Sequence, residues 1–381
     1  MNKILFIITG LDHAGAEMQV IELARGLVLN GWSVKIISLI KPTISVEKLN
    51  AEGILIDTLD MEKGVPDPRA IWQLRKLIKA YKPDIVHSHM IHANLLTRIT
   101  RLFTRMPVLI STAHNTNEGG KVRMMMYRLT DSLCNLMTNV SQDAVDSFIQ
   151  KGASTRNKLI FVPNGINLKR FKKNAEASES LRQELGLKDE FIWLAVGRLC
   201  EAKDYPTLLR SFNQVVKQNS HCQLLIVGDG VDRHMLEEMS SSLGLDDKIR
   251  FLGIREDIPR IMNASDAYVM SSLWEGMPMV LLEASACELP MVATDVGGNR
   301  EVVKEGISGY LARASDSDHL AERMMKLMSL STKDRDHMGE KAREYVMKHY
   351  EMDAIIAKWE ALYHQLKGQR NINMSTIQGG L

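Results

Sequence analysis

The chain has 381 residues, of which 45% are hydrophobic and 25% are charged, the composition of an ordinary globular protein. Lys and Arg number 48 and Asp and Glu 46, so the net charge gives no reason to expect a nucleic-acid partner. No apolar run approaches the roughly 18 residues that a membrane span needs, and the short N-terminal run lacks a signal-peptide cleavage site. The four cysteines form no C-x-x-C pair, which argues against a zinc knuckle or disulfide framework and favours a reducing cytosol.

Strand-like and helix-like segments alternate through the first half of the chain. Continuous apolar runs predict strands buried on both faces, and apolar residues repeated every three or four positions predict helices. The predicted elements are strand Lys3–Thr9, helix Glu17–Asn30, strands Ser33–Leu39 and Ile54–Leu59, helix Arg69–Tyr81, strand Asp84–Ser88, helix Leu95–Thr104 and strand Val108–Thr112. This order is typical of a parallel, doubly wound sheet.

The alternation weakens at residues 169–189, a charged stretch poor in apolar residues, which we interpret as a linker. It resumes with strand Phe191–Gly197, helix Tyr205–Gln218, strand Gln223–Val227, helix Asp232–Leu243, strands Ile249–Leu252 and Ala267–Met270, helix Val280–Ala286, strands Met291–Thr294 and Gly309–Leu311, and helices Asp316–Ser329, Asp334–Lys348 and Met352–Lys367. We therefore predict two α/β domains, residues 1–168 and 190–348, facing a central cleft. Residues 368–381 form a polar tail that we expect to be disordered.

The segment 274–283, with the sequence WEGMPMVLLE, combines a turn with a helix start. Gly276 permits a tight turn, and Pro278 suits the first position of a helix. The first N–H groups of that helix, those of Met279, Val280 and Leu281, would then be free to bind an anion such as a diphosphate.

Two carboxylates flank this helix start. Glu275 precedes the helix, and Glu283 lies about two turns further along on the same side, roughly 12 Å away. This spacing suits hydrogen bonds to two sugars of one ligand and is too long for a close general acid and base. The alternative is that both are ordinary surface acids.

Cations and glycines follow other strands of the second half. Arg198 comes directly after one strand with Lys203 close behind, and together they could neutralise a diphosphate, although surface cations are the alternative. Gly228-Asp229 and the Gly297-Gly298 pair, residues 297–298, also follow strands, where glycine lets backbone approach a ligand closely. Because ligands collect at the carboxyl ends of parallel strands, the shared edge is stronger evidence than any single motif.

The ordered set of motifs resembles that of the retaining GT-B glycosyltransferases of family 4, also described as glycosyl transferases group 1. The motifs extend over nearly the whole chain: A-G-A-E at 14–17, V-H-S-H at 86–89, T-A-H at 112–114, P-N-G-I at 163–166, G-R at 197–198 with Lys203, G-D-G at 228–230, F-L-G at 251–253, E-x7-E at 275–283 and G-G-N-R-E at 297–301. The resemblance implies a GT-B fold of two Rossmann-like domains, with a last helix, residues 349–367, crossing back to the first domain. Ala14 departs from the family, which usually has a second glycine there.

The resemblance implies a role for each matching residue. Arg198 and Lys203 would hold the donor diphosphate, Glu283 would bind the ribose hydroxyls, and Glu275 would lie beside the transferred sugar. The other residues implied to bind the nucleotide-sugar are Gly15, His89, Gly228, Asp229, Leu252, Gly276, Met277, Met279 and Val280.

Two histidines of the first half end strands. The resemblance places His114 next to the donor sugar, and His89 lies near it; the alternative for each is a structural histidine. With Arg198, Lys203 and Glu275, His114 completes the predicted catalytic set. No general base stands out, so the resemblance favours front-face attack, in which the leaving diphosphate takes the acceptor proton while the two cations stabilise its charge. We expect neither a metal nor a cofactor.

The first half is basic. Residues 1–170 contain 22 Lys or Arg and 14 Asp or Glu, against 26 and 32 in the remainder. Arg98, Arg101 and Arg105 share one predicted helical face, and residues 121–128 mix basic residues with three consecutive methionines. Such a surface suits peripheral membrane contact or a lipid-diphosphate acceptor, and the alternative is a helix packed on the sheet with a solvated outer face.

We therefore expect a retaining, metal-independent hexosyltransferase that moves a hexose or N-acetylhexosamine from a UDP- or GDP-sugar to a glycan or polyprenyl-diphosphate-linked acceptor. Its expected setting is cell-surface polysaccharide biosynthesis (O-antigen or capsule), in the cytoplasm or at the inner face of the plasma membrane. One alternative is a dehydrogenase, but residues 10–15 do not form the G-x-G-x-x-G pattern. The other is a non-catalytic two-lobed sugar-binding protein, which would need a signal peptide for export.

Overall fold

The computed structural model describes residues 2–12, 15–116 and 118–368. The chain divides into two compact units. The first contains the residues up to Gly165 together with those from Met352 onward, and the second is Ile166–Glu351. The predicted tail, apart from Gly368, and Ala14 lie outside the described residues.

A parallel sheet, seven-stranded within the described residues, forms the centre of the first unit, with the strand order β3-β2-β1-β4-β5-β6-β7. Its strands are β1 (Lys3–Ile8), β2 (Ser33–Ser38), β3 (Ile54–Thr58), β4 (Ile85–His89), β5 (Val108–Ala113), β6 (Leu136–Asn139) and β7 (Leu159–Phe161). Its helices are α1 (Gly15–Leu29), α2 (Val46–Ala51), α3 (Arg69–Tyr81), α4 (Ile91–Thr100), α5 (Gly120–Thr130), the 3₁₀ turn η1 (Asp131–Leu133), α6 (Gln142–Gln150) and α15 (Met352–Gly368).

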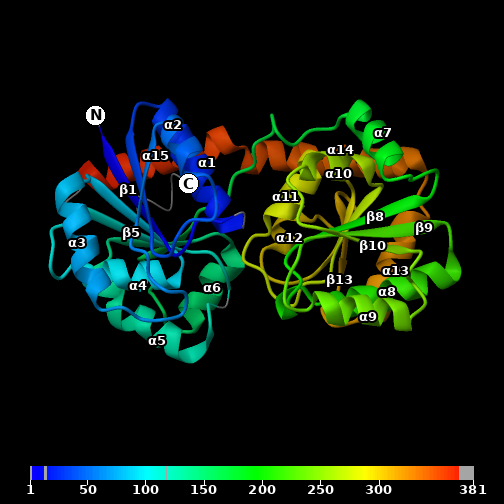
Figure 1. Cartoon of the computed structure of the whole chain (residues 1–381), viewed down its shortest axis with the longest axis horizontal. Helices are drawn as coiled ribbons and strands as arrows, with labels where there is room; N and C mark the ends of the chain where they lie inside the picture. The colour runs from blue at the N-terminus through cyan, green and yellow to red at the C-terminus, as the bar shows by residue number, and fades with distance from the viewer. Residues whose placement is uncertain (1, 13–14, 117, 369–381) are drawn as a thin grey trace. The chain divides into compact units, whose positions relative to one another are not determined.

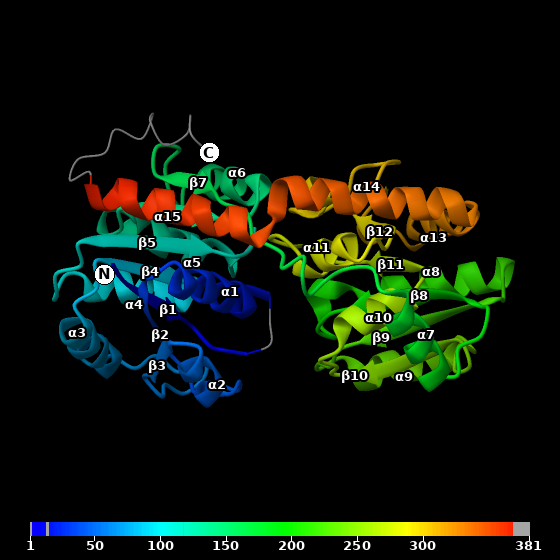
Figure 2. The ribbon, with the colours of Figure 1, turned by 90° about the horizontal axis from the view of Figure 1, so that it is seen from above.

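Helices cover both faces of this sheet (Figures 1 and 2). Alternate residues of β1 point to opposite faces, so Phe6 packs in the cluster with α1 and α15, and Leu5 packs in the cluster with α3. The last helix, α15, is therefore part of the first unit, as expected for a helix that returns there.

A parallel sheet is also the centre of the second unit; in the described part of the chain it has six strands in the order β10-β9-β8-β11-β12-β13. The strands are β8 (Phe191–Val196), β9 (Cys222–Val227), β10 (Ile249–Gly253), β11 (Ala267–Met270), β12 (Met291–Thr294) and β13 (Gly309–Ala312). The helices are α7 (Ala175–Glu184), the 3₁₀ turn η2 (Glu201–Lys203), α8 (Tyr205–Gln218), α9 (Arg233–Ser242), α10 (Ile258–Ala264), α11 (Met279–Ala286), α12 (Asn299–Val302), α13 (Ser317–Met328) and α14 (Thr332–Tyr350).

Both faces of the second sheet are also covered, with α8, α9 and α13 on one side and α10, α11 and α14 on the other (Figure 1). The two Rossmann-like units confirm the predicted fold class. Every predicted strand and helix is present, with ends that differ by a few residues.

The structure differs from the prediction of a linker at residues 169–189. Residues 169–189 contain the helix α7. The side chain of Asn174 caps the N-terminus of this helix by accepting the Ala177 N–H, and the helix packs against α10 inside the second unit. The helix shows only one buried residue, Leu181, which is why its composition suggested a linker.

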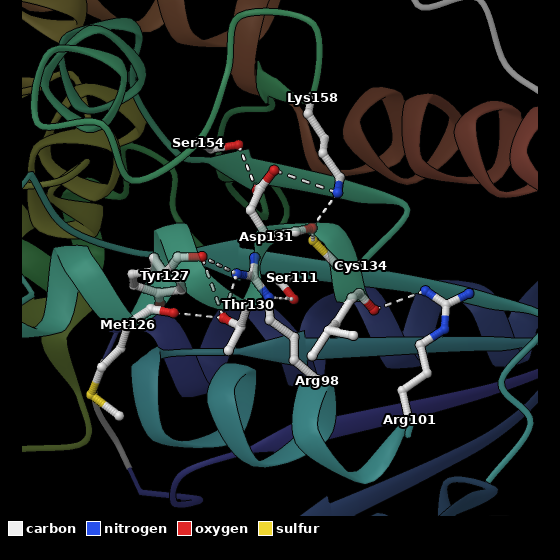
Figure 3. Close-up of polar contacts among 11 residues, drawn as sticks. Arg98, Arg101, Ser111, Met126, Tyr127, Thr130, Asp131, Cys134, Ser154 and Lys158 are labelled. Atoms are coloured by element: carbon white, nitrogen blue, oxygen red, sulfur yellow. Dashed lines mark hydrogen bonds and ion pairs between the residues drawn. The ribbon is translucent and has the colours of Figure 1, made fainter. Parts of the chain in front are cut away.

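The predicted basic face of α4 is a second correction. Arg98 is fully buried rather than exposed. Its guanidinium lies between β5 and α5, where Nε donates to Ser111 Oγ (3.1 Å) and Nη1 donates to Tyr127 O (3.2 Å), as Figure 3 shows. Arg101 is partly buried and donates to main-chain oxygens, so Arg105 is the one member of the three that is exposed.

No helix in the described part of the chain is both long enough and apolar enough to span a lipid bilayer.

Candidate functional site

The second sheet reverses its winding direction between β8 and β11, the position where open α/β sheets bind ligands. Lys203 follows β8 and Glu275 follows β11. The two side chains meet there: Lys203 Nζ donates to Glu275 Oε1 at 2.5 Å. Ser272 Oγ donates to the same oxygen at 2.7 Å. The structure thus brings together two of the predicted catalytic residues at the strand-order reversal.

The two loops that carry this pair are also joined through their main chains. Ser271 Oγ donates to Lys203 O (2.7 Å), and the Leu273 N–H donates to Ala202 O (2.9 Å). Asp204, in the left-handed region at φ 44°, then caps α8. These bonds fix where the Lys203 side chain begins, so its position does not depend on the ion pair alone.

Glycines allow the neighbouring loops to close on this position. A Cβ on Gly228 would lie 2.0 Å from Gly197 O, and one on Gly297 would lie 2.0 Å from Glu275 O. Both residues also have positive φ, of 132° and 49°, which side chains disfavour. The predicted glycine motifs therefore serve first to pack backbone on backbone around the candidate site.

Arg198, at the carboxyl end of β8, is exposed and makes no hydrogen bond or ion pair with any described residue. Asp229, after β9, is also exposed, but its carboxylate accepts the Gly230 N–H (2.8 Å) and lies 3.9 Å from Arg233. Leu252 is partly exposed on β10. Among the predicted site cations, Arg198 is thus the one whose guanidinium forms no hydrogen bond or ion pair with the described residues.

The helix α11 begins at Met279 with Pro278 as its N-cap, close to the prediction. Gly276 and Met277 are buried, and Met279 and Val280 are partly exposed. One predicted free donor is corrected: the Leu281 N–H donates to Pro278 O (3.1 Å), because the first turn tightens in the 3₁₀ manner.

Glu283 lies in the middle of α11, and its carboxylate forms no hydrogen bond or ion pair with the residues that the structure describes. Burial raises the pKa of its carboxyl from 4.5 to about 7, and the nearby positive charge of Arg170 opposes this only partly. A poorly solvated carboxylate without a protein donor is suited to accept hydrogen bonds from a ligand.

The predicted histidines and Gly15 belong to the first unit. His89 ends β4 and His114 follows β5, and the rings are joined between His89 Nδ1 and His114 Nε2 at 3.0 Å. The other ring nitrogens, His89 Nε2 and His114 Nδ1, are enclosed and have no hydrogen-bond partner among the described residues. Burial lowers the pKa of His114 to about 4 and that of His89 well below 6.5, so both are neutral at pH 7.

Further contacts hold these histidines. The His89 ring lies against the ring of His87 (centroids 4.0 Å apart), and His87 is fixed by Tyr363 Oη (2.8 Å) and Thr112 Oγ1 (2.6 Å). Met90, directly after His89, has φ 71° and ψ 154°, a strained conformation of the kind that clusters at functional sites. Gly15 is exposed as the first residue of α1.

Sequence reasoning missed Ser272, His87 and Glu118 as site residues. Ser272 shares the carboxylate oxygen bound by Lys203, and Glu118 accepts the His114 main-chain N–H (3.1 Å). Glu118 is the single acid of residues 85–130, which was a signal that could have drawn attention to it.

Comparisons with known proteins agree with this architecture. The model of Glycosyltransferase Family 4 matches residues 13–170, and the model of Glycosyl transferases group 1 matches residues 177–345. The chain is 28% identical over 274 residues to the UDP-Gal:alpha-D-GlcNAc-diphosphoundecaprenol alpha-1,3-galactosyltransferase of Escherichia coli, covering 69% of this chain and 71% of that protein.

Two solved structures show the same fold. The structure of Anabaena Alr3699/HepE in complex with UDP-glucose has a TM-score of 0.83 at 22% identity and covers 95% of this chain and 99% of that one. A glycosyltransferase from Rickettsia africae has a TM-score of 0.83 at 20% identity, covering 97% and 100%. Since the two family models together match both units and the fold is GT-B, the chain belongs to the family 4, or group 1, glycosyltransferases.

Proposed function

We propose that the protein is a retaining, metal-independent glycosyltransferase that moves a hexose or N-acetylhexosamine from a UDP- or GDP-sugar to a lipid-linked glycan of a cell-surface polysaccharide. The observation that carries the proposal is the contact between Lys203 and Glu275 at the strand-order reversal of the second sheet. The contact brings together a cation that could bind a diphosphate and a carboxylate that could accept hydrogen bonds from a sugar. Membership of a glycosyltransferase family favours this function over a dehydrogenase or a non-catalytic sugar-binding protein.

The donor would extend along the carboxyl edge of the second sheet. Glu283 would accept the ribose hydroxyls, and Leu252 would border the base. Gly276, Met277, Met279 and Val280 would surround the sugar and phosphates, with Gly228 and Asp229 close by. UDP as the nucleotide is supported by the E. coli relative, which uses UDP-Gal, and by HepE, which was solved with UDP-glucose.

The transfer step would break the bond between the anomeric carbon and a diphosphate oxygen and form a bond from the acceptor oxygen on the same face of the sugar. The acceptor proton would pass to the leaving diphosphate. Arg198, which is exposed and has no partner among the described residues, and Lys203, displaced from Glu275 by the phosphate, would stabilise the charge of the leaving group. Glu275, freed from the ion pair, would accept sugar hydroxyls.

In the first unit, His114 would contact the transferred sugar and His89 would orient its ring. Because both rings are neutral at pH 7, one ring nitrogen donates and the other accepts in the bond between them. Gly15, without a side chain at the start of α1, would let the N-terminal loop approach the phosphates.

A lipid-linked acceptor is supported by the diphosphoundecaprenol substrate in the name of the E. coli relative and by one surface of the first unit. The helix α5 exposes Val122 (66%), Met125 (54%) and Leu129 (71%) at helical spacing on its solvent side. Exposed Lys121 and Arg128 flank them. Apolar and basic side chains in this arrangement suit the surface of an anionic membrane.

The setting would be the cytoplasm, at the inner face of the plasma membrane. Cys134, Cys200, Cys222 and Cys287 are all free thiols, which suits a reducing compartment.

The test is a thermal-shift screen with UDP, GDP and a panel of their sugars, because a ligand that binds the native state raises the melting temperature. Wild-type protein should be stabilised by one nucleotide class, and the Glu283→Gln and Lys203→Ala variants should respond weakly. Equal responses of all three proteins to every nucleotide would show that the site has been placed wrongly. The donor that gives the largest shift is then assayed for release of its nucleotide.

A further inference from the structure

Behind His114, the first unit contains a buried polar network that the catalytic scheme above does not use. Its members are Asn94 and Arg98 of α4, Tyr127 of α5 and Glu118 of the loop between β5 and α5. Asn94, Arg98 and Tyr127 are each 0% exposed. Burying this many polar groups is costly unless they are paired, so the arrangement calls for an explanation beyond simple packing.

Glu118 is the centre of the network. Its Oε1 accepts the main-chain N–H of His114 (3.1 Å), and its Oε2 accepts the hydroxyl of Tyr127 (2.5 Å). Its own main-chain oxygen accepts Arg123 Nη1 (2.9 Å). Because each carboxylate oxygen accepts a hydrogen bond from the protein, the orientation of the Glu118 side chain is fixed from two directions.

Tyr127 links this carboxylate to the sheet. Its hydroxyl accepts Asn94 Nδ2 (3.0 Å), which also donates to Thr112 O (2.9 Å), two residues before His114. The Arg98 guanidinium lies over the Tyr127 ring, 5.1 Å from its centroid. Figure 3 shows Arg98 reaching from α4 to Tyr127 and Thr130 of α5 and to Ser111 of β5.

Arg98 supplies positive charge to this region. No carboxylate among the described residues lies within ion-pair distance of it, and its Nη2 has no described hydrogen-bond partner. The charge nevertheless reaches Glu118: burial raises the pKa of that carboxyl, and the hydrogen bonds from Tyr127 and His114 and the charges of Arg123 and Arg98 oppose the rise. Hydrogen bonds to Ser111, Tyr127 and Thr130 and the contact with the Tyr127 ring partly offset the cost of burying this cation.

We infer that Glu118 is a positioning residue for the transfer reaction, which fixes the main chain at His114 while His89 fixes the ring. His114 is thus held at two points, by the Glu118 bond to its N–H and by the 3.0 Å bond to His89. This inference rests on the proposed contact of His114 with the donor sugar. A displacement of His114 of about 1 Å would cost on the order of tenfold to a hundredfold in rate, because reacting groups tolerate little misplacement.

The experiment compares Glu118→Ala, Glu118→Gln and Tyr127→Phe with wild type. Ser154→Ala is the matched control, because Ser154 is buried in the same unit and the substitution removes one hydrogen bond, from Ser154 Oγ to Asp131 Oδ1 (2.8 Å, Figure 3), rather than a bond of the Glu118 network. Three quantities are measured: hydrogen exchange at the His114 amide, UDP affinity by calorimetry, and kcat and KM for UDP release from UDP-galactose and UDP-glucose.

For Glu118→Ala we expect the His114 amide to exchange at least tenfold faster, UDP affinity to stay within twofold, and kcat to fall about tenfold or more with KM little changed. Glu118→Gln, which keeps an acceptor for the His114 N–H, should recover most of kcat. Ser154→Ala should lose stability with kcat within twofold of wild type. If Glu118→Ala does not fold, the same quantities are compared between wild type and Tyr127→Phe, which removes only the hydroxyl that donates to Glu118.

Two results would overturn the inference: a kcat unchanged when the His114 amide has lost its protection, or an equal fall of kcat in Ser154→Ala at the same loss of melting temperature. A wild-type protein that binds no UDP would instead contradict the proposed function. The exchange measurement needs no substrate, so it would still decide whether Glu118 holds His114.

Discussion

The burial of Glu283 leads to a prediction about stability and ligand binding together. In the folded protein its pKa is about 7, against 4.5 for the ordinary carboxyl. Between these two pH values the folded state keeps a proton that the unfolded state has released. The contribution of Glu283 to the free energy of unfolding is therefore highest below pH 4.5, falls as the pH rises toward 7, and stays at the lower level above it.

The substitution Glu283→Gln removes this titration with almost no change in volume. The difference between 4.5 and about 7 corresponds to about 3 kcal/mol, an upper limit because the side chain keeps some exposure to water. The variant should have nearly the stability of wild type at pH 4.5 and be more stable by up to about 3 kcal/mol at pH 8. Urea denaturation at a series of pH values measures the difference, and the exposed Glu322→Gln variant controls for loss of a negative charge.

Ligand binding should show the opposite order. Ribose hydroxyls that donate to Glu283 favour its ionised form, so a bound nucleotide-sugar lowers the pKa again. Wild-type affinity for UDP-glucose, whose diphosphate does not titrate in this range, should rise on the order of tenfold from pH 5.5 to pH 8. Glu283→Gln should bind more weakly and without this rise. A stability difference between Gln and Glu that is the same at pH 5 and pH 8 would refute the reasoning.

The remaining predictions address the other parts of the proposed site. Lys203→Ala should lower the rate of nucleotide release by a factor on the order of a hundred to a thousand, with an unchanged circular dichroism spectrum, because the leaving diphosphate loses a cation. A chelator such as EDTA should leave that rate unchanged, and complete loss would contradict metal-independent transfer. Gly297→Ala should lower the melting temperature by an amount equivalent to about 1–3 kcal/mol and weaken UDP binding, because its Cβ would lie 2.0 Å from Glu275 O at a φ of 49°. Replacing Met125 and Leu129 by Ser should reduce binding to phosphatidylglycerol-containing vesicles at least tenfold in a sedimentation assay while UDP affinity is kept; retention of vesicle binding would show that α5 is not the lipid contact.

The sequence predicted β1 to β5 of the first sheet and all six described strands of the second, because strands buried on both faces read as continuous apolar runs; the short strands β6 and β7 were not predicted. β1 is an example of such a run, with five of its six residues buried. What the sequence could not supply is which loops meet. Lys203 and Glu275 are 72 residues apart, and their contact exists only because β8 and β11 are neighbours in the sheet.

The errors arise where tertiary contacts override the residue type. A run containing Arg98 was interpreted as an exposed basic face because arginine is seldom fully buried. In the structure, neighbouring hydroxyl and carbonyl oxygens bind its guanidinium, and these come from β5 and α5, elements distant in sequence. The role of His89 as a ligand contact stays a prediction, and the structure adds that its ring is bonded to His114.

The helix α5 shows why some site features leave no readable pattern. It was not predicted as a helix, because its large apolar residues do not form the inward stripe that marks a core helix. Only Met124 and Tyr127 are buried, whereas Val122 and Leu129 face solvent. The two buried residues pack in a hydrophobic cluster, and Tyr127 also forms polar contacts with Glu118 and Arg98. Since the inner face serves the His114 loop and the outer face contributes nothing to the core, substitutions on the two faces should affect catalysis and vesicle binding separately.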